Sequence, residues 1–319
     1  MDYSRSTVLI WGGAGFIGSH LCEALLRLGA RIICADNLST GSEDNIRHLQ
    51  SDARFRFIRS DICDELSFPE RIDVAFNLAS PASMSAIRQD PLACIAGNVL
   101  GTMKFLHMVE RHGARAVLAS TSEVYGDPEV TPQPETYRGC VNTIGPRSCY
   151  DESKRLLETV SYEFHRRGVD VRLARIFNTY GPRLPKNDAR VVPRFLRNAF
   201  ANRPLRIYGD GSVTRSFCYV DDQVDGLIAL SRAETNELLV CNIGTDEEVT
   251  MLDLAKRIRL ITGTDSEIIF DKAREDDPTH RKPNLTFTLS QLDWRPRITL
   301  DEGLAKAAEY YKSFRDIEI

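Results

Sequence analysis

Tyr150 and Lys154 are the two residues in this sequence whose types and spacing most directly suggest catalysis. If the segment is helical, the two side chains lie on one face, one turn apart. A lysine ammonium that close favours the charged form of a phenol, so it lowers the pKa of Tyr150 from its ordinary value of about 10. A tyrosine with a lowered pKa can take a proton from a sugar or alcohol hydroxyl. The same spacing also fits an amphipathic helix with a half-buried tyrosine, so the pair needs support from the rest of the chain.

A glycine-rich turn near the start of the chain predicts a dinucleotide site. Residues 7–11 form an apolar run typical of a buried strand, and the pattern G-x-x-G-x-x-G follows with Gly12, Gly15 and Gly18. A helix is predicted over 17–28, and a second strand over 31–35 ends at Asp36. Backbone N–H groups of such a turn bind a pyrophosphate, and the acid binds the adenosine ribose. Asp36 favours NAD over NADP because it repels a 2′-phosphate.

The remaining pattern predicts an α/β fold, a Rossmann-type doubly wound parallel sheet with a smaller C-terminal α/β substrate lobe. Further strands are predicted over residues 55–59, 74–78, 116–120 and 169–175, and helices over 91–109 and from Tyr150 to about Arg167. The loop 127–147 is rich in Pro and Gly, and long loops of this kind often form a lid or a site wall.

The pattern changes after Pro182. Helices are predicted to open near residues 187–193 and after 214–222, a short strand spans 205–208, and a polar loop spans 275–284. We expect residues 1–178 and about 218–242 to form the NAD-binding Rossmann domain, and about 179–217 and 243–319 to form the substrate lobe.

Composition excludes several classes of function. The 319-residue chain has a formal net charge of −4 and no block of basic residues, which disfavours binding to nucleic acid or to a membrane surface. No apolar run approaches the roughly 18 residues of a membrane span. The eight cysteines occur singly, without a C-x-x-C pair, so they predict neither disulfides nor a metal site. We therefore expect a cytoplasmic protein.

Several motifs together produce a specific resemblance. They are the glycine turn, Thr121-Ser122-Glu123, the Tyr150/Lys154 pair and the segment 177–183. With them the chain resembles the extended short-chain dehydrogenase/reductases that modify nucleotide sugars, and within these it is most similar to the UDP-glucuronate decarboxylases. The similarity covers nearly the whole chain and is most specific over residues 118–133, 145–155, 171–183, 187–192 and 275–283.

The resemblance implies a lyase that holds NAD⁺ tightly and causes no net redox change. Tyr150, as phenolate, would take the proton of the sugar C4 hydroxyl while hydride passes to NAD⁺. Lys154 would hold the tyrosine pKa down and bind the nicotinamide ribose, and Thr121 would contact the same hydroxyl. The 4-keto uronate would lose CO₂, and the 4-keto pentose would be reduced to UDP-xylose or released. Glu123 would orient the sugar or relay a proton, and Arg215 would bind the uronate carboxylate or the enolate, or assist C5 protonation.

The resemblance also assigns binding residues. Those assigned to NAD are Gly12, Gly15, Phe16, Ile17, Gly18, Asp36, Asn37, Asp61, Ile62, Leu78, Ala79, Ser80, Tyr150 and Lys154. Those assigned to the substrate, a UDP- or TDP-sugar, are Ser122, Asn178, Arg190, Tyr208, Arg215 and Arg281. Within the second set, Asn178, Arg190 and Arg281 would bind the diphosphate, and Tyr208 would pack beside the base.

Alternative functions stay open. Ser122 stands where nucleotide-sugar 4,6-dehydratases carry an aspartate, which argues against a dehydratase. A 4-epimerase does not require Glu123 and Arg215, which argues against an epimerase. A non-catalytic NAD-binding regulatory protein would keep the same fold. By resemblance, we expect a homodimer that pairs the helices near 91–109 and 148–167.

The chain departs from the family in two places. Residues 84–88 and Ala93-Cys94 lack an expected proline, aromatic residue and Lys-Thr pair, and Arg138 and Cys140 replace a tryptophan and a histidine. These departures leave open the nucleotide, UDP or TDP, and whether the product is the pentose or the 4-keto pentose.

Overall fold

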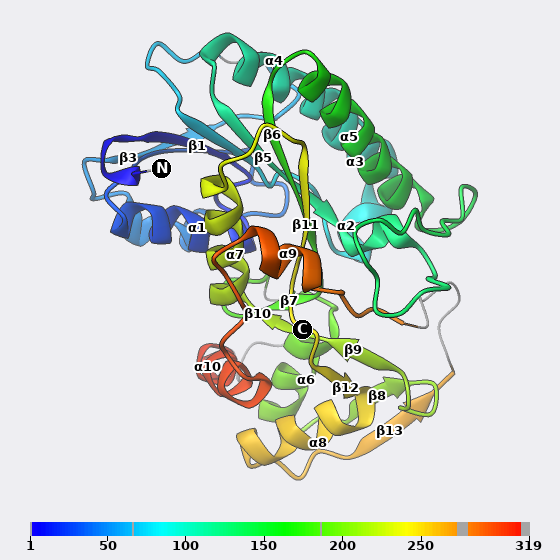
Figure 1. Ribbon diagram of the computed structural model, residues 1–319. Coiled ribbons are helices and arrows are strands. Elements are labelled where there is room, and N and C mark those ends of the chain that lie inside the picture. Colours follow the sequence, from blue (N-terminus) through cyan, green and yellow to red (C-terminus); the bar gives the residue numbers. More distant parts are fainter. Residues whose placement is uncertain (1, 66, 186, 273–279, 314–319) are drawn as a thin grey trace.

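A seven-stranded parallel sheet forms the centre of the computed structural model, which describes residues 2–65, 67–185, 187–272 and 280–313 (Figure 1). In spatial order its strands are β11 (Leu239–Ile243), β6 (Asp170–Ile176), β5 (Arg115–Thr121), β4 (Val74–Asn77), β1 (Thr7–Trp11), β2 (Arg31–Asp36) and β3 (Phe55–Arg59). Thr7 lies opposite Arg31, and Val8 lies opposite Val74. The order of the strands reverses between β1 and β4, which is where open α/β sheets bind ligands. The predicted Rossmann-type fold is confirmed.

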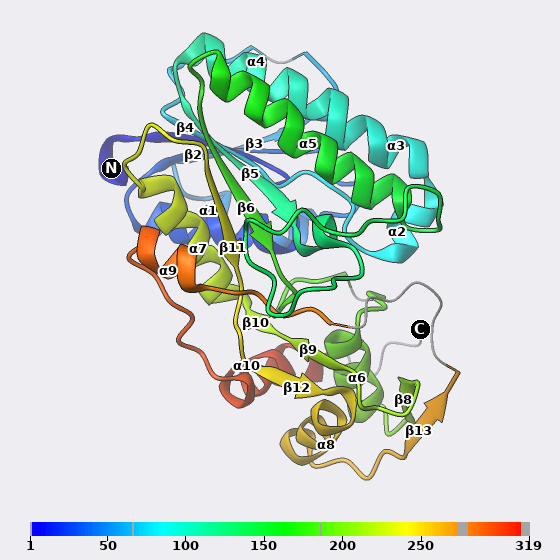
Figure 2. The same cartoon turned by 45° about the vertical axis from the view of Figure 1, so that its right-hand side comes forward.

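The strands are apolar because helices cover both faces of the sheet. Every residue of β1 and β4 is buried, as expected for a parallel sheet between two helical layers. One layer contains α1 (Phe16–Arg27) and α7 (Val220–Arg232), which pack together. The other contains α3 (Pro91–Ala96), α4 (Thr102–His112) and α5 (Ser148–Arg166), seen side by side in Figure 2. The short helix α2 (Met84–Gln89) packs against α3.

The helix predicted over 91–109 is longer and less regular than expected. A π-helical segment, η4 (Gly97–Gly101), separates α3 from α4. Buried Asn98 in this segment donates from Nδ2 to Ser153 Oγ on α5, at 2.9 Å. Such wide turns are frequent beside functional sites, and no periodicity in the sequence reveals one.

The combined helix Pro91–His112 is long and apolar enough, by length and composition, to cross a membrane. The prediction that no apolar stretch approaches that length was therefore too strict. A single such helix is weak support for a membrane span, because a core helix of a globular protein passes the same test. Phe105, Leu106 and Val109 pack on the sheet here, and 44% of the most apolar window is buried.

A second group of elements lies at the carboxyl edge of the sheet (Figure 1). Its helices are α6 (Val191–Phe200), α8 (Met251–Thr262) and α10 (Leu300–Lys312). Its strand pairs are β7 (Thr179–Tyr180) with β10 (Cys218–Tyr219), β8 (Leu205–Tyr208) with β13 (Ile268–Asp271), and β9 (Thr214–Ser216) with β12 (Glu248–Thr250). The sheet strands β6 and β11 lead directly into β7 and β12, so their carboxyl ends face this group.

The division into two lobes stays a prediction. Helix α9 (Thr286–Gln291), which lies within the residues predicted for the substrate lobe, packs on β11 of the sheet. Residues 275–279 of the predicted polar loop lie outside the described residues. The remaining short helices are η1 (Tyr3–Arg5), η2 (Glu43–Asn45), η3 (Arg47–Leu49) and η5 (Ser122–Tyr125).

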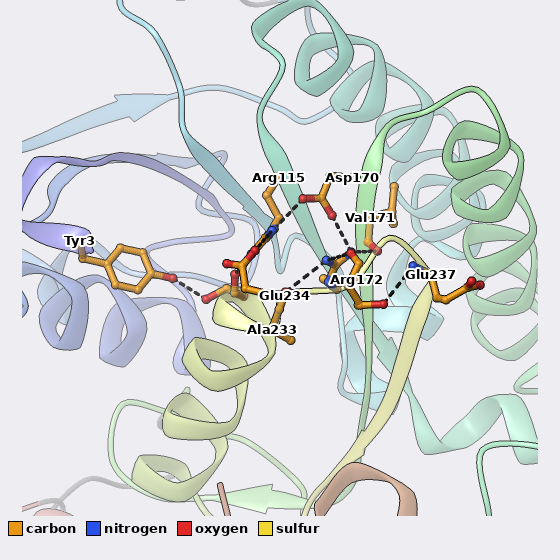
Figure 3. A network of polar contacts seen from close by, with 10 residues as sticks. Tyr3, Arg115, Asp170, Val171, Arg172, Ala233, Glu234 and Glu237 are labelled. Carbon is orange, nitrogen blue, oxygen red and sulfur yellow. Dashed lines mark hydrogen bonds and ion pairs between the residues drawn. The ribbon is translucent and has the colours of Figure 1, made fainter. Parts of the chain in front are cut away.

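A polar network closes the opposite, amino edge of the sheet (Figure 3). Arg172 is fully buried and donates to the Val171, Ala233 and Thr235 carbonyls at 2.8–3.2 Å. Asp170 bridges Arg172 and Arg115, at 2.5 and 2.7 Å. The network joins the starts of β5 and β6 to the end of α7, far from the carboxyl edge.

Candidate active site

The glycine turn between β1 and α1 leaves room for a dinucleotide only because side chains are missing there. Gly12 has φ +79°, and a Cβ atom on it would lie 2.7 Å from the Leu78 carbonyl. A Cβ atom on Gly18 would lie 2.1 Å from the Gly12 oxygen. Helix α1 begins at Phe16 with Gly15 as its N-cap residue, so its free N–H groups face this turn. The turn therefore fits a pyrophosphate bound at a helix N-terminus.

Asp36 lies at the end of β2 and is held by backbone donors. Its two carboxylate oxygens accept hydrogen bonds from Leu38 N at 2.8 Å and Ala14 N at 3.0 Å. Burial raises the pKa of Asp36 above its ordinary value, although these bonds oppose the increase. The carboxylate is thus fixed beside the glycine turn, where an adenosine ribose would lie.

The other residues predicted for NAD follow the carboxyl ends of neighbouring strands. Asn37 donates from Nδ2 to Asp61 Oδ2 at 2.6 Å, linking the ends of β2 and β3, and Ile62 is buried beside them. Leu78 N donates to the Trp11 carbonyl at 2.8 Å, which holds the end of β4 against β1. Ala79 and Ser80 come next, and Ile17 lies in the first turn of α1. The structure therefore brings all the predicted cofactor residues to one edge of the sheet.

Tyr150, Lys154 and Thr121 meet at the next two elements along this edge. Tyr150 lies in the first turn of α5, and its hydroxyl hydrogen-bonds to the Thr121 side chain at the end of β5. Lys154 donates from Nζ to the Ala119 carbonyl at 2.8 Å, and its Nζ lies 5.8 Å from the centre of the Tyr150 ring. All three side chains are buried. The predicted helix and the predicted trio are both present.

The predicted direction of the Tyr150 pKa shift is wrong. Burial raises the pKa of Tyr150 above its ordinary value, and the bond with Thr121 only opposes this increase. Burial also lowers the pKa of Lys154 to about 8. The sequence suggested that lysine would lower the tyrosine pKa, but desolvation of both groups dominates.

A cluster of four charged residues adjoins Tyr150, and we call Glu123, Arg147, Asp151 and Arg281 the four-charge cluster. Glu123 pairs through Oε2 with Arg147 Nη2 at 2.5 Å and through Oε1 with Arg281 Nη2 at 2.8 Å. Arg147 Nε lies 3.8 Å from Asp151 Oδ2, and Arg281 Nη1 donates to Asn178 Oδ1 at 3.0 Å. Two carboxylates and two guanidiniums therefore share one largely buried site.

Asp151 is the member of this cluster with an altered proton affinity. Its pKa is raised to about 7, because burial and, to a smaller extent, the neighbouring Glu123 carboxylate raise it by more than Arg147 and Arg281 lower it. Its Oδ1 atom is buried without a hydrogen-bond partner among the described residues. Asp151 can hold a proton near neutral pH.

Sequence reasoning missed Arg147 and Asp151. Arg147 is the N-cap residue of α5, and Asp151 directly follows Tyr150 in its first turn. This closeness to Tyr150 in the sequence could have marked both as candidate site residues. Arg281 was predicted as a diphosphate ligand, and the structure joins it to Glu123 and Asn178.

The remaining predicted substrate residues have separate surroundings. Buried Ser122 lies between Thr121 and Glu123 in η5. Arg190 is the N-cap residue of α6 and pairs with Asp188 at 2.7 Å. Tyr208 ends β8, with the Arg194 guanidinium 5.1 Å from its ring centre. Arg215, on β9, is buried and donates to the Thr214 carbonyl at 2.8 Å.

The segment that departs from the family lies against Tyr150. Ile87 of α2 and Cys94 of α3 are buried with Tyr150 in one apolar cluster, and Met84 packs on it. Of the two loop departures, Arg138 accepts a hydrogen bond at its carbonyl from Arg155 Nη1, at 2.8 Å, and Cys140 is exposed. The unusual residues 84–94 therefore shape the wall behind the tyrosine.

A model of the NAD dependent epimerase/dehydratase family matches residues 8–244. The chain belongs to this family. The family is NAD-dependent by its description, and the glycine turn and Asp36 provide the matching site. NAD is the cofactor.

Curated relatives that match nearly the whole chain are UDP-glucuronic acid decarboxylases. The chain is 44% identical over 310 residues to UDP-glucuronic acid decarboxylase 1 of Arabidopsis thaliana, an alignment that covers 97% of this chain and 70% of that protein. It is 43% identical to UDP-glucuronic acid decarboxylase 1 of Xenopus tropicalis, with 98% and 73% covered.

Solved structures of the same family share the whole fold. UDP-glucuronic acid 4-epimerase of Bacillus cereus, in complex with UDP-glucuronic acid and NAD, superposes with a TM-score of 0.86 at 28% identity, covering 97% of this chain and 99% of that one. UDP-glucose 4-epimerase of Thermotoga maritima, with UDP-glucose, gives 0.88 at 30% identity, covering 96% and 99%.

Proposed function

We propose that this family member is an NAD-dependent decarboxylase of a nucleotide-linked glucuronic acid, UDP-glucuronate being the favoured substrate. The observation that supports it most is the four-charge cluster immediately beside the Thr121–Tyr150–Lys154 trio. The trio suits oxidation of a sugar hydroxyl, and the two guanidiniums suit a substrate that has a carboxylate. The decarboxylase relatives, at 44% and 43% identity, support the same assignment.

The first half of the reaction belongs to the trio. A bound NAD would supply a hydride acceptor for sugar C4 and, once reduced, a hydride donor to the same carbon. Tyr150 takes the C4 hydroxyl proton, Thr121 holds the same hydroxyl, and the Lys154 ammonium favours the phenolate. An oxidised nicotinamide is cationic, and a positive charge close to the phenol opposes the burial that raises the Tyr150 pKa.

The second half is loss of CO₂ from the 4-keto uronate. The bond between C5 and the carboxylate carbon breaks, and its electron pair moves into an enolate whose charge rests on the C4 oxygen. Tyr150, now protonated, donates a hydrogen bond to that oxygen. A proton then adds to C5, giving a 4-keto pentose, which is reduced at C4 to UDP-xylose or released.

Product analysis tests this proposal. The protein is incubated with UDP-glucuronate and, separately, TDP-glucuronate without added reductant, and CO₂ and the sugar nucleotides are measured by mass spectrometry. We expect CO₂ and a pentose or 4-keto pentose nucleotide. Tyr150→Phe should lower the rate by roughly 10³-fold, whereas Tyr162→Phe, at an exposed tyrosine of the same helix, should not. A C4-epimerised uronate without CO₂ would establish a 4-epimerase instead.

We also propose that the protein is a homodimer through the outer face of α3, η4 and α5. An open groove of about 680 Å³ lies there, lined in part by Ile95, Val99 and Leu156. Further large apolar side chains are exposed on these helices and at the start of α4, namely Leu92, Leu100, Met103 and Tyr162. Several exposed apolar side chains on neighbouring helices fit an interface between subunits.

A cytoplasmic location remains part of the proposal. All eight cysteines are free thiols in the structure, which fits a reducing compartment. Fractionation of cells that express the protein at its native level is the test, and recovery with a secreted fraction would contradict it.

A further inference from the structure

Gln133, in the long loop 127–147, makes an unusual number of contacts with the segment that contains Arg281. Its backbone N donates to the Lys282 carbonyl at 2.8 Å, and its carbonyl accepts from Asn284 N at 2.9 Å. Its side-chain Oε1 accepts from Lys282 N, also at 2.8 Å. The residue is 1% exposed. Three hydrogen bonds to one buried glutamine therefore fix Lys282 and Asn284, one and three positions after Arg281.

The glutamine side chain is itself held rigidly. Its Nε2 donates to the Val130 carbonyl at 2.9 Å and to Thr131 Oγ1 at 3.1 Å. The Gln133 carbonyl also accepts from Asn242 Nδ2 at 2.9 Å. The same Asn242 nitrogen donates to the Asn284 carbonyl at 3.2 Å. Asn242 belongs to β11, so the contact is anchored to the central sheet. Every polar atom of the Gln133 amide has a partner, which is what a rigid support requires.

Arg147, at the other end of the same loop, holds the other member of the pair. It is the N-cap residue of α5, and its Nη2 binds Glu123 Oε2 at 2.5 Å. Glu123 therefore lies between Arg147 on one side and Arg281 on the other. When the geometry of a charge pair is set before the ligand binds, less free energy is spent on ordering its side chains during binding.

We propose that Gln133 and Arg147 are positioning residues that hold Arg281 and Glu123 in contact ahead of substrate binding, and that this support serves the loss of CO₂ and not C4 oxidation. The proposal rests on the proposed function, because it concerns the second half of that reaction. The loop 127–147 is then a fixed wall of the site and not a lid. Tyr150 N donates to the Arg147 carbonyl at 2.9 Å, and Thr121 Oγ1 accepts from Glu123 N at 3.3 Å. Both contacts use backbone atoms of Arg147 and Glu123, so removal of the Gln133 or Arg147 side chain leaves them in place, and we expect C4 oxidation to continue.

Two variants, Gln133→Met and Arg147→Met, remove the side-chain part of the support while keeping side-chain bulk. Arg147→Lys restores the charge without the planar fork. Single-turnover reactions with UDP-glucuronate are quenched, the 4-keto uronate is trapped by borodeuteride reduction, and CO₂ is counted. We expect the ratio of trapped 4-keto uronate to CO₂ to rise by about 10-fold in both methionine variants. Arg147→Lys should give an intermediate ratio.

Arg155→Met is the matched control. Arg155 binds the same loop through the Arg138 carbonyl and binds η5 through the Val124 carbonyl, both at 2.8 Å, and the contacts described for its side chain include none with the four-charge cluster. It should loosen the loop yet leave the ratio unchanged. An unchanged ratio in both methionine variants, or an equal rise in Arg155→Met, would overturn the proposal.

Amide hydrogen exchange gives a readout that needs no turnover. Exchange at Lys282 and Asn284 should quicken in Gln133→Met and stay slow in Arg155→Met. Equal protection in Gln133→Met and the unaltered protein would refute the positioning role. Failure of the proposed function is distinct, because it shows as absence of CO₂ from the unaltered protein.

Discussion

At the scale of single residues, burial controls the charges of the candidate site. Tyr150 and Lys154 are both removed from water, which disfavours the phenolate and the ammonium alike. The pKa of Tyr150 is therefore raised while that of Lys154 falls to about 8. Burial therefore favours the protonated phenol, and a positive charge such as that of an oxidised nicotinamide would favour the phenolate.

The lowered pKa of Lys154 predicts the basic side of the pH profile. Above pH of about 8 the side chain loses its charge and no longer favours the phenolate. We expect kcat/KM for CO₂ release to fall as pH rises through that value. In Lys154→Arg the charge persists, so any residual activity should lack this fall. A wild-type profile that stays flat up to the ordinary lysine pKa would contradict the prediction.

Asp151 predicts a dependence of stability on pH. The carboxyl group titrates at 3.8 when unperturbed and at about 7 in the folded protein. Between these values only the unfolded chain loses the proton, so the folded state loses stability as pH rises, and the loss is complete above pH of about 7. Asp151→Asn removes the titrating group and with it this loss of stability.

Thermal unfolding at two pH values checks this sign. We expect Asp151→Asn to raise Tm relative to the unaltered protein, and to raise it by more at pH 8 than at pH 5. The direction follows because the pKa of Asp151 is higher in the folded protein than in the unfolded chain. Glu152→Gln, at the neighbouring and far more exposed carboxylate, should show no such difference. An equal effect of Asp151→Asn at both pH values would mean that the native carboxyl is ionised throughout.

Local motifs allowed part of this site to be predicted from the sequence. Gly12, Gly18, Asp36 and Tyr150 could be assigned because each belongs to a short pattern with its own geometry. The direction of the Tyr150 pKa shift could not, because desolvation depends on how deeply α2, α3 and α5 bury the ring. The depth of burial depends on tertiary packing and cannot be read from the sequence alone.

At the scale of elements, the layer formed by α3, η4, α4 and α5 has two apolar faces. One packs on the sheet through residues such as Phe105 and Val109, and the other is exposed. Periodicity predicted the helices but not the π-helical turn at Gly97–Gly101, because the wide turn is set by packing. In contrast, β1 and β3 were predicted with the bounds that the structure has, since each ends in turn residues that stop a strand.

Leu100→Glu tests the exposed face. Leu100 is 55% exposed in η4, and a carboxylate there would have to lose its water in the proposed interface. We expect sedimentation velocity to show a monomer for Leu100→Glu and a dimer for the unaltered protein. Leu260→Glu, at an even more exposed leucine of α8, should stay dimeric. A monomeric unaltered protein at working concentration would exclude this interface.

At the scale of the whole molecule, contacts between distant segments build both the site and the scaffold. Glu123 and Arg281 lie far apart in the chain, and their contact depends on a loop, the sheet edge and the segment before α9. No pattern within the sequence links them. The fold class was predictable because the alternation of strands and helices is local, whereas the four-charge cluster depends on tertiary packing.

The amino-edge network of Figure 3 predicts a large effect on stability and none on chemistry. Arg172→Met would remove a buried guanidinium that donates to the Val171, Ala233 and Thr235 carbonyls, and it would leave Asp170 with Arg115 alone. We expect the free energy of unfolding in urea to fall by about 3 kcal/mol, with kcat/KM per folded molecule unchanged. Glu234→Ala, whose ion pair with Arg115 is exposed, should change it by less than about 0.5 kcal/mol. Similar losses in the two variants would show that burial is not the cause.

The position of β11 in the chain has a consequence for biosynthesis. This strand pairs with β6, yet α6, β8, β9, β10 and α7 are all translated between the two. Until Leu239–Ile243 leaves the ribosome, the hydrogen-bonding groups on one side of β6 have no partner strand, and an open strand edge can pair with another chain. The nascent protein is therefore most prone to aggregate late in translation, after most of its sheet has been made, and chaperone binding should be strongest on ribosome-bound chains that end just before Leu239.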